Sequence, residues 1–397
     1  MKILFVTDQY TPAVNGIVTH ILLLKEELGK RGHTIYIVAP SFGSKTEPEK
    51  NVFRMPSFVF PPRPVDRFTF PWNRKVEREL ARLEFDVVHN QLGLLGYLGT
   101  RIAKIRNLPN VATLHTPFTQ FERWSFPYLL KYSGGFLKLL MRQYFKNYDL
   151  VLCPSHRSAD ELRDAHISAP IQILHNGIKL ERFEKASSEA FYKEFKVDKK
   201  KPIVSWVGRV EAGKNADIAI SALSEVVKKV PNVLLVIAGG GNLVEAAKKL
   251  VAENNLDKNV LFTGMQPPEM VASLNKAAKL FLFTSDTDNL PTVVIEAMAC
   301  GIPIVALKDK AVFDLVDEGK NGYFTTKEPT NIAEKVLEIL ENPKKQKSLG
   351  TGSLKKAGEF SVEKYTDTLL AIYAKLISEK QGLSVDPSTR SGQASAN

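Results

Sequence analysis

Chemically versatile side chains gather in residues 286 to 305, which read DTDNLPTVVIEAMACGIPIV. A turn that carries Asp288 leads into an apolar helical pattern with a single acid, Glu296. Pro291 suits the first turn of a helix, so the N–H groups of Thr292 to Val294 would be free to bind an anion. Both carboxylates can then face one ligand and accept hydrogen bonds from ribose or sugar hydroxyls.

The same residues permit two other interpretations. Asp286 and Asp288 have the spacing of a metal-binding pair. Alternatively, Asp288 would cap the helix and Glu296 would be buried in a structural pair, which requires no ligand. The residues alone leave these alternatives open.

Two cations five residues apart, Arg209 and Lys214, lie in the segment GRVEAGKN, which overlaps the end of the apolar run PIVSWVGR at 202–209. Loops at the carboxyl ends of parallel strands bind the substrates of doubly wound folds. The planar fork of an arginine and the point charge of a lysine together suit a diphosphate. Surface salt bridging is the alternative.

Glycines mark two more places where a ligand could approach the backbone. Asn15-Gly16 stands at the start of an amphipathic helical pattern, and the amino end of a helix favours a phosphate. The turn from Gly239 to Asn242, which includes Gly240, could admit a nucleotide or be a tight turn. The dinucleotide fingerprint G-x-G-x-x-G is absent.

The elements that must position these residues alternate between short apolar runs and helix-length segments. This pattern indicates βαβ units and parallel sheets. Apolar runs occur on both sides of a polar, Lys-rich stretch at 185–201. The expected fold class is therefore α/β, with two Rossmann-like doubly wound domains facing a central cleft. The expected boundaries are 1–185 for the first domain, 186–201 for a linker, 202–361 for the second domain, 362–380 for a packed terminal helix and 381–397 for a disordered tail.

Composition is that of an ordinary globular protein. The 397 residues include 44% apolar and 24% charged residues, and the length favours two domains. The apolar run from Ile3 to Val6 is too short for a signal peptide, and no stretch reaches the roughly 18 apolar residues of a membrane span. Cys153 and Cys300 are the only cysteines and are interpreted as buried thiols. We expect a cytoplasmic protein without disulfides.

The net charge of +11 is concentrated in the first half of the chain. Residues 1–185 hold 26 basic and 17 acidic residues, which indicates an anionic partner. The segments 58–72 and 121–148 are rich in aromatic residues, and the latter contains a basic amphipathic pattern suited to an anionic bilayer. A core-packing helix is the alternative, and no nucleic-acid recognition module accompanies the charge. The expected membrane or acceptor contacts are Trp72, Trp124, Lys131, Lys138, Arg142 and Lys146.

Taken together, these motifs resemble a known family. DNLP followed by EAMACGIPIV, with GRVEAGK, Asn15-Gly16 and the RGH at 31–33, is similar to glycosyltransferase family 4, the retaining enzymes of the two-Rossmann-domain GT-B architecture. The resemblance spans most of residues 1 to 380. Asp288 stands where the family usually has Glu, so the carboxylate is retained on a side chain one methylene shorter.

The resemblance implies a role for each matching residue. Arg209 and Lys214 would hold the donor diphosphate, and Glu296 would bind the nucleotide ribose. Asp288 would contact the transferred sugar, and His115, in TLHTPF, would lie beside that sugar at the scissile bond. The other implied donor contacts are Gly16 at the phosphates, Gly240 and Met265 near the base, and Asn289, Leu290 and Thr292 around the anion-binding helix end.

The resemblance also implies retention of configuration. Because no unassigned carboxylate marks itself out as a nucleophile, we expect attack on the same face as the leaving group, with the departing diphosphate helping to take the acceptor proton. His115 would position and stabilise rather than act as a base. No metal or other cofactor is expected beyond the nucleotide-sugar donor, for which UDP-glucose is favoured.

Lipid-directed members of the family, such as diacylglycerol glucosyltransferases and phosphatidylinositol mannosyltransferases, share a basic, amphipathic first domain. HTPFTQFERW is more similar to the diacylglycerol type. The favoured reaction is therefore transfer of glucose to the free hydroxyl of a diacylglycerol, by a protein bound to the inner face of the cell membrane. Alternatives are phosphatidylinositol or a soluble sugar as acceptor, a metal-dependent GT-A transferase, and a non-catalytic sugar-nucleotide-binding protein. The oligomeric state is open.

Overall fold

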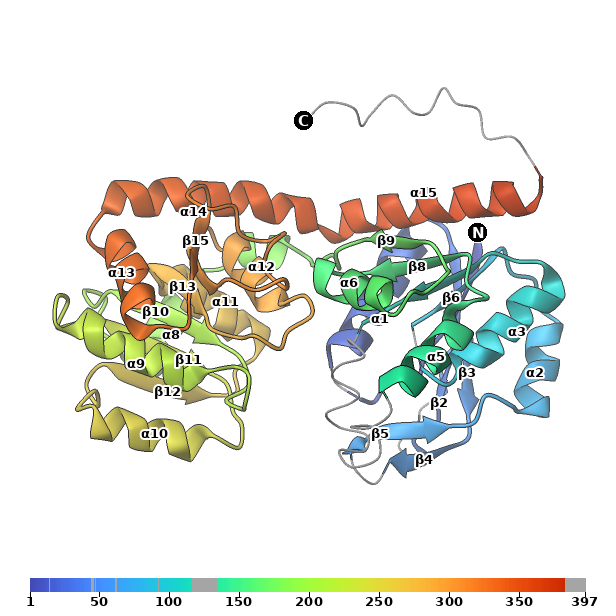
Figure 1. Ribbon diagram of the computed structural model, residues 1–397, viewed down its shortest axis with the longest axis horizontal. Coiled ribbons are helices and arrows are strands. Elements are labelled where there is room, and N and C mark those ends of the chain that lie inside the picture. The colour runs from blue at the N-terminus through green and yellow to red at the C-terminus, as the bar shows by residue number, and fades with distance from the viewer. Residues whose placement is uncertain are drawn as a thin grey trace. The chain divides into compact units, whose positions relative to one another are not determined.

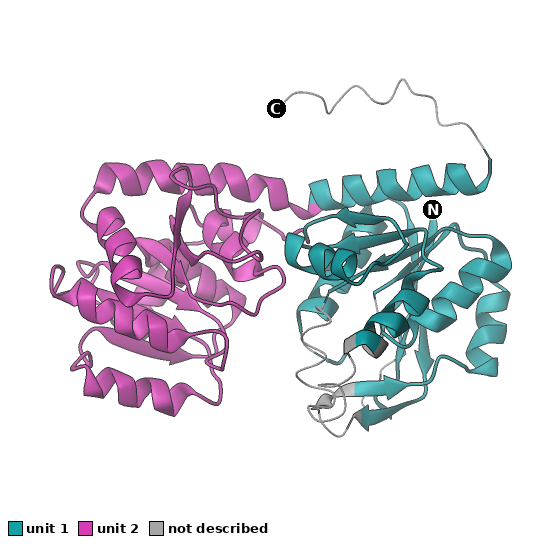
Figure 2. Ribbon diagram, in the orientation of Figure 1, with its two compact units in different colours: residues 1–175, 363–397 teal, residues 176–362 magenta. Residues whose placement is uncertain are grey.

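The computed structural model of the chain describes residues 1–13, 15–43, 46, 48–60, 63–91, 93–115 and 134–382. The tail expected at 381–397 therefore lies outside the described residues from 383 onward. The chain divides into two compact units (Figure 2). Unit 1 comprises Met1–His175 with Glu363–Asn397, and unit 2 comprises Asn176–Val362.

Unit 1 is built on a parallel sheet with the strand order β3-β2-β1-β6-β7-β8-β9 (Figure 1). The chain adds β2 and β3 on one side of β1 and later adds β6 on its other side. The loops after β1 and β6 therefore diverge at a topological switch point, where ligands of such sheets bind. A separate antiparallel hairpin pairs β4 with β5. The strands are β1 (Lys2–Val6), β2 (Thr34–Pro40), β3 (Val52–Met55), β4 (Ser57–Phe60), β5 (Arg63–Thr69), β6 (Val87–Asn90), β7 (Asn110–Thr113), β8 (Leu150–Cys153) and β9 (Ile171–Ile173).

Helices cover both faces of the sheet in unit 1. Apolar residues of α1 and α15 share one core cluster with side chains from one face of the sheet. Residues of α2 and α3, and of α5 and α6, form two clusters on the other face. The helices are α1 (Gly16–Lys30), α2 (Arg74–Ala81), α3 (Gly96–Arg106), α5 (Gly134–Phe145), α6 (His156–Asp164) and α15 (Val362–Lys380).

Unit 2 repeats the same plan with the strand order β12-β11-β10-β13-β14-β15, all parallel. Its switch point lies between β10 and β13. The strands are β10 (Ile203–Val207), β11 (Leu234–Ala238), β12 (Val260–Gly264), β13 (Leu280–Phe283), β14 (Ile304–Leu307) and β15 (Gly322–Thr325). The helices are α7 (Glu181–Glu184), α8 (Glu189–Phe195), α9 (Ala216–Val227), α10 (Val244–Glu253), α11 (Pro268–Ala277), α12 (Thr292–Ala299), α13 (Pro329–Leu340) and α14 (Pro343–Ala357).

The strands of unit 2 read as continuous apolar runs because both faces of the sheet are covered. Ile203 and Phe281 point to the cluster that contains α7, α8, α11 and α12. Val204 and Leu280, their neighbours in sequence, point to the cluster that contains α9, α10 and α13. Each fully buried side chain of this size contributes about 1.5–3 kcal/mol by leaving water.

The segment expected to be a linker, residues 186–201, differs from that expectation. It contains α8, whose Phe191 is fully buried in the core of unit 2 beside Tyr192 and Phe195. Ser273 accepts a hydrogen bond from the Phe191 N–H at 2.9 Å. The prediction of a linker rested on the Lys-rich composition. It overlooked three aromatic side chains at helical spacing, which bury enough area to hold the segment against unit 2.

The terminal helix α15 packs on unit 1 through residues spaced by four. Tyr365, Leu369 and Tyr373 are buried there. The Tyr373 hydroxyl lies 2.5 Å from Nδ1 of His89, whose Nε2 lies 2.7 Å from the Thr113 hydroxyl. Residues more than 250 positions apart in sequence thus share one buried polar network. Among the helices that the structure describes, none is long and apolar enough to cross a bilayer.

Candidate active site

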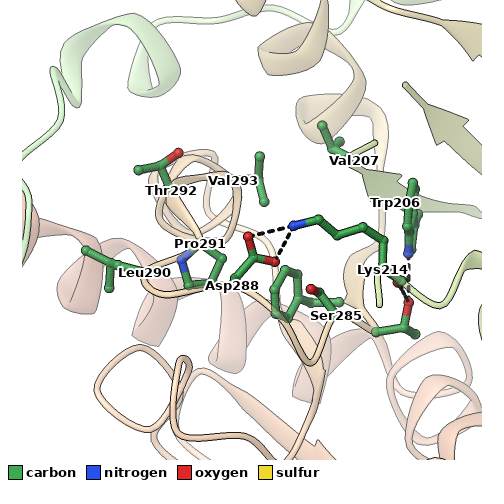
Figure 3. Close-up of a pocket in the computed structure, with 12 residues that line it drawn as sticks. Trp206, Val207, Lys214, Ser285, Asp288, Leu290, Pro291, Thr292 and Val293 are labelled. Atoms are coloured by element: carbon green, nitrogen blue, oxygen red, sulfur yellow. Dashed lines mark hydrogen bonds and ion pairs between the residues drawn. The ribbon is translucent and has the colours of Figure 1, made fainter. Parts of the chain in front are cut away.

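A pocket in unit 2 is formed by the ends of β10 and β13 and the start of α12 (Figure 3). Its lining includes four residues that the sequence singles out: Lys214, Asp288, Leu290 and Thr292. These residues come from two loops about 70 positions apart in the chain. They meet because β10 and β13 are neighbours in the sheet, so that their carboxyl ends lie side by side.

An ion pair joins the two charged residues of this pocket. Nζ of Lys214 lies 2.7 Å and 2.8 Å from the two carboxylate oxygens of Asp288, as Figure 3 shows. Both side chains are largely buried. Asp288 therefore binds the lysine, and α12 has no side-chain cap. The interpretation of Asp288 as a helix cap does not hold.

Hydrogen bonds to Thr284, which follows β13, hold the loop that carries Lys214 in place. The Thr284 hydroxyl donates to the Lys214 carbonyl at 2.9 Å and accepts from the Trp206 indole N–H at 2.9 Å. Gly213 has a φ of 84°, and a Cβ there would meet the Thr287 side chain at 2.3 Å. Only glycine fits this turn, so the position of the lysine is built into the backbone.

Of the three backbone donors expected at the start of α12, the Val294 N–H is already used, because it donates to the Pro291 carbonyl at 3.0 Å. Pro291 precedes the helix, and no side chain caps its first turn. Thr292 and Val293 line the pocket and are partly exposed. The unpaired N–H groups of a first helical turn carry partial positive charge and attract anions. Asn289 precedes them and is buried.

Glu296 lies one turn further into α12. Burial raises the pKa of its carboxyl to about 7, and the nearby Arg182 charge opposes that rise. Among the described residues, none donates a hydrogen bond to this carboxylate. The interpretation of Glu296 as one half of a buried structural pair is not supported. Its carboxylate can instead accept hydrogen bonds from a ligand.

The remaining polar residues of the two loops have other partners. Arg209 is exposed and pairs with Glu211 at 2.9 Å. Asp286 pairs with Lys327 at 2.5 Å, so the two aspartates of DTD bind different lysines. Within the described part of the chain, no group of three His, Cys, Asp or Glu residues is placed to hold a metal ion. The metal-pair interpretation therefore gains no support from the geometry.

Gly240 and Met265, both expected near a base, lie together. A Cβ on Gly240 would be 3.2 Å from Cγ of Met265, whose side chain is 86% exposed. The neighbouring Gly239 allows close packing of the two loops, because a Cβ there would lie 1.7 Å from the Gly208 carbonyl oxygen. An exposed thioether beside a bare backbone offers an apolar surface to a flat ring.

In unit 1, Gly16 begins α1, and the helix is capped by Asn15. The Asn15 side chain accepts from the N–H groups of Ile17 at 3.0 Å and Val18 at 3.1 Å. Among the residues that the structure describes, no atom lies within 4 Å of a Cβ placed on Gly16. The described residues therefore leave open space at Gly16.

His115 follows β7, and its Nε2 lies 2.7 Å from Oε1 of Gln91. Burial lowers the pKa of His115 to about 4, so the ring is neutral at pH 7. The His20 ring packs against it with centroids 5.1 Å apart. The sequence analysis missed Gln91 and His20. Only the adjacency of β6 and β7 shows that Gln91, at the end of one strand, meets His115 at the end of the next.

The sequence analysis also missed Asp8, at the end of β1. Burial raises the pKa of its carboxyl to about 7. The Leu95 N–H donates to Oδ2 of Asp8 at 3.1 Å. An acid directly after the first strand was a usable signal, because the carboxyl edge of a parallel sheet binds ligands.

The expected membrane contacts are exposed where the structure describes them. Trp72 is 64% exposed. Lys138, Arg142 and Lys146 are exposed on or just after α5, and Arg142 also donates to the Ala165 carbonyl at 2.7 Å. Trp124 and Lys131 lie outside the described residues. The helix buries Met141 and Phe145 and leaves Leu139 and Leu140 exposed, so its apolar residues occupy more than the core-facing side.

The fold matches solved structures of enzymes. Sucrose-phosphate synthase from Thermosynechococcus elongatus superposes with a TM-score of 0.75 over 95% of this chain and 99% of that chain, at 19% identity. Anabaena HepE in complex with UDP and glucose gives a TM-score of 0.73 over 94% of this chain and 100% of that chain, at 20% identity. Two parallel α/β units of this kind are the GT-B architecture of glycosyltransferases.

The sequence places the chain within that class. The family model described as glycosyl transferases group 1 matches residues 187–356, and the model described as Glycosyltransferase Family 4 matches residues 14–182. The chain belongs to glycosyltransferase family 4, as the motifs predicted. It is 27% identical over 387 residues to the alpha-monoglucosyldiacylglycerol synthase of Acholeplasma laidlawii, covering 94% of this chain and 95% of the relative. It is 28% identical over 326 residues to the synthase of the same name from Streptococcus pneumoniae, covering 80% of this chain and 74% of the relative.

Proposed function

We propose that this glycosyltransferase moves glucose from UDP-glucose to the free hydroxyl of a membrane diacylglycerol, with retention of configuration. The observation that carries the proposal is the pocket in which Lys214 and Asp288 meet at the uncapped start of α12. It combines a cation, a carboxylate and free backbone donors, the groups that a sugar diphosphate requires.

The donor would occupy unit 2. Lys214 and the α12 N–H groups bind the diphosphate, and the exposed Arg209 exchanges its partner Glu211 for a phosphate oxygen. Glu296, to which no described residue donates, accepts from the ribose hydroxyls. Asp288 contacts the transferred sugar. Met265 and Gly240 provide the apolar surface for the base.

Transition-state stabilisation would come mainly from charge at the leaving group. As the bond to the sugar breaks, negative charge grows on the diphosphate, and Lys214, Arg209 and the helix end would stabilise that charge. The departing diphosphate takes the acceptor proton, and attack follows on the same face. The His115 ring, neutral at pH 7 and held by Gln91, positions the sugar rather than accepting a proton.

The lipid acceptor is supported by the relatives and by the surface of unit 1. The relatives from Acholeplasma laidlawii and Streptococcus pneumoniae are named as monoglucosyldiacylglycerol synthases. The β4–β5 hairpin exposes Phe58, which pairs across the strands with Phe68, and Trp72 follows it. Cations on α2 come next in the chain. An exposed aromatic cluster beside cations suits the headgroup region of an anionic bilayer. The exposed cations of α2 and its C-cap are Arg74, Lys75, Arg78 and Arg82.

A donor screen followed by a transfer assay tests the proposal. Thermal shifts measured with a panel of nucleotide sugars should be largest with UDP-glucose, because tight donors stabilise the folded state by mass action. Glu296→Ala should abolish that shift, and Glu253→Ala on α10 should keep it. Purified protein with UDP-glucose and diacylglycerol in anionic vesicles should then form an alpha-linked glucolipid.

The other outcomes identify the alternatives. If product forms only with phosphatidylinositol or with a soluble sugar, that compound is the acceptor in place of diacylglycerol. Activity lost in EDTA and restored by a divalent cation would favour a metal-dependent transferase. If no nucleotide sugar gives a product and the donor stays intact, the protein is a non-catalytic binding protein.

A further inference from the structure

Asp8 occupies the position in unit 1 at which ligands of parallel sheets bind. It follows β1, the strand at the topological switch point, and it faces the loop after β6. None of the proposed donor contacts gives it a role. The contacts of its carboxylate indicate which kind of group it can bind.

The carboxylate is fixed through one of its oxygens. Oδ2 of Asp8 accepts from the Leu95 N–H at 3.1 Å, and Leu95 is the N-cap of α3, a helix without a cap from its own side chains. Gly93 packs directly on this oxygen, since a Cβ there would lie 1.8 Å from it. Asp8 thus supplies a tertiary cap for α3, and this use leaves its other oxygen available.

The second oxygen has no donor within the described part of the chain. Among the residues that the structure describes, none donates to Oδ1 of Asp8, and no cation pairs with the side chain. A structural cap needs only one acceptor, which an asparagine provides equally well. Burial raises the pKa of the Asp8 carboxyl to about 7. A hydroxyl that donated to Oδ1 would stabilise the charged form and offset that cost.

Exposed apolar side chains lie on and next to the segment after β6 that packs on Asp8. Leu94 is 39% exposed and Tyr97 is 47% exposed. The Tyr97 ring lies 5.0 Å from the Tyr144 ring, and the Tyr144 hydroxyl donates to the Gly93 carbonyl at 2.8 Å. One turn before Tyr144 on α5, Leu140 is 47% exposed. A carboxylate with a free acceptor, beside exposed aliphatic and aromatic side chains, matches an amphiphile with an uncharged hydroxyl.

We propose that Asp8 is an acceptor-binding residue: its Oδ1 accepts a hydrogen bond from the free hydroxyl of a neutral diacylglycerol, and the acyl chains lie along Leu94, Tyr97 and Leu140. This inference rests on the proposed function and specifies its acceptor. A carboxylate at this point orients a neutral hydroxyl and repels a phosphate. The contact therefore favours diacylglycerol over an acceptor whose phosphate would lie beside the hydroxyl.

Asp8→Asn separates the two uses of the side chain. The asparagine keeps one oxygen for the Leu95 N–H but presents an amide N–H₂ in place of the second acceptor. The control is Asp86→Asn, because the Asp86 carboxylate also accepts from a backbone N–H, that of Lys2 at 2.7 Å, and is exposed at the other edge of the same sheet. Asp8→Ala removes both the cap and the acceptor.

Binding of dihexanoylglycerol, a short-chain monomeric diacylglycerol, should be measured by calorimetry on the full chain saturated with UDP. We expect Asp8→Asn to bind it at least tenfold more weakly than the wild type, with the UDP affinity and the melting temperature unchanged. Asp86→Asn should match the wild type. Leu140→Ser should weaken dioctanoylglycerol more than dihexanoylglycerol, because the longer chains have more contact to lose.

Equal affinity of Asp8→Asn and the wild type, or no binding by the wild type, would overturn the inference, whatever the protein transfers. A lower melting temperature of Asp8→Asn that accounts for the weaker binding would reduce Asp8 to a helix cap and would also overturn it. The proposed function fails separately, when the wild type forms no glycolipid from any nucleotide sugar. The two results are therefore distinguishable.

Discussion

Lys214 and Asp288 form a two-pronged ion pair, with Nζ 2.7 Å and 2.8 Å from the carboxylate oxygens, in the pocket at the start of α12. The residues are 74 positions apart in the chain. Before a donor binds, each neutralises the other, so neither charge is buried alone. A diphosphate that arrived would share the lysine and leave the Asp288 carboxylate available to the sugar. Under the proposed function, the pair keeps both groups in position for the donor.

Asp288→Asn tests this pairing. The variant leaves Lys214 without its carboxylate, so we expect the free energy of unfolding to fall by about 1–3 kcal/mol. We also expect turnover to fall by about 100-fold, since the sugar contact is lost. Asp288→Glu should retain most of the stability, because its carboxylate still reaches the lysine. Denaturant unfolding and initial rates measure both effects, and wild-type values for Asp288→Asn would contradict the pairing.

Glu296 predicts how donor affinity depends on pH. Burial raises the pKa of the free carboxyl to about 7. Ribose hydroxyls donate to the charged form, so donor binding favours ionisation and releases a proton below that pKa. Affinity for UDP should therefore be constant above about pH 8 and fall up to tenfold per pH unit below pH 7. Calorimetry across pH 5.5–8.5 measures it.

The matched variant for this pH effect is Glu296→Gln, which fills the same volume and does not titrate. It should bind UDP more weakly at pH 8 and show a much shallower dependence on pH. An equally steep pH dependence in the variant would assign the effect to another group, such as the phosphate of the ligand.

Surface charge on α5 should control membrane binding. Reversing Lys138 and Lys146 to Glu should weaken binding to anionic vesicles by about tenfold or more, since each lysine near such a surface contributes about 1 kcal/mol. The control is the double reversal of Lys344 and Lys347, two exposed lysines of α14 in unit 2. Flotation at low and physiological salt measures the effect. Equal losses in both doubles would indicate attraction by net charge alone.

We expect an ion-pair cluster on unit 2 to make the stability of the protein sensitive to acid. Glu338 contacts Lys345 at 2.6 Å and Lys335 at 3.1 Å, and these hydrogen bonds, led by that of Lys345, lower its pKa to about 2. A lowered carboxyl pKa contributes stability that is fully present above the ordinary value of 4.5 and is lost as pH falls toward 2.

Glu338→Gln should therefore lower the free energy of unfolding at pH 7 by about 1–2 kcal/mol, discounted because the carboxylate is partly exposed to solvent. The difference from wild type should shrink as pH falls from 4.5 toward 2. Glu334→Gln, on the same helix and more exposed, should change stability little. Denaturant unfolding at pH 7 and pH 3 measures the difference in free energy of unfolding between variant and wild type. A difference that stays constant with pH would show that the ion pairs are not its cause.

The sequence by itself determined the features that depend on neighbours along the chain. Apolar runs separated by helical patterns indicate parallel α/β sheets because side-chain periodicity reports local geometry directly. The motif around Asp288 and Glu296 located the start of α12 for the same reason, since helix signals lie within a few residues of each other. The motif also identified the glycosyltransferase family, and glycosyltransferase family models match both halves of the chain.

Only the tertiary structure decided which of these residues meet. Strand order brings Lys214 to Asp288 and Gln91 to His115, and no local pattern encodes strand order. Burial likewise depends on the whole fold. It explains why the expected linker is a packed helix around Phe191, and why one oxygen of Asp8 has no donor among the described residues. Pairing and desolvation are properties of three-dimensional neighbours, so they became visible only when the chain was folded.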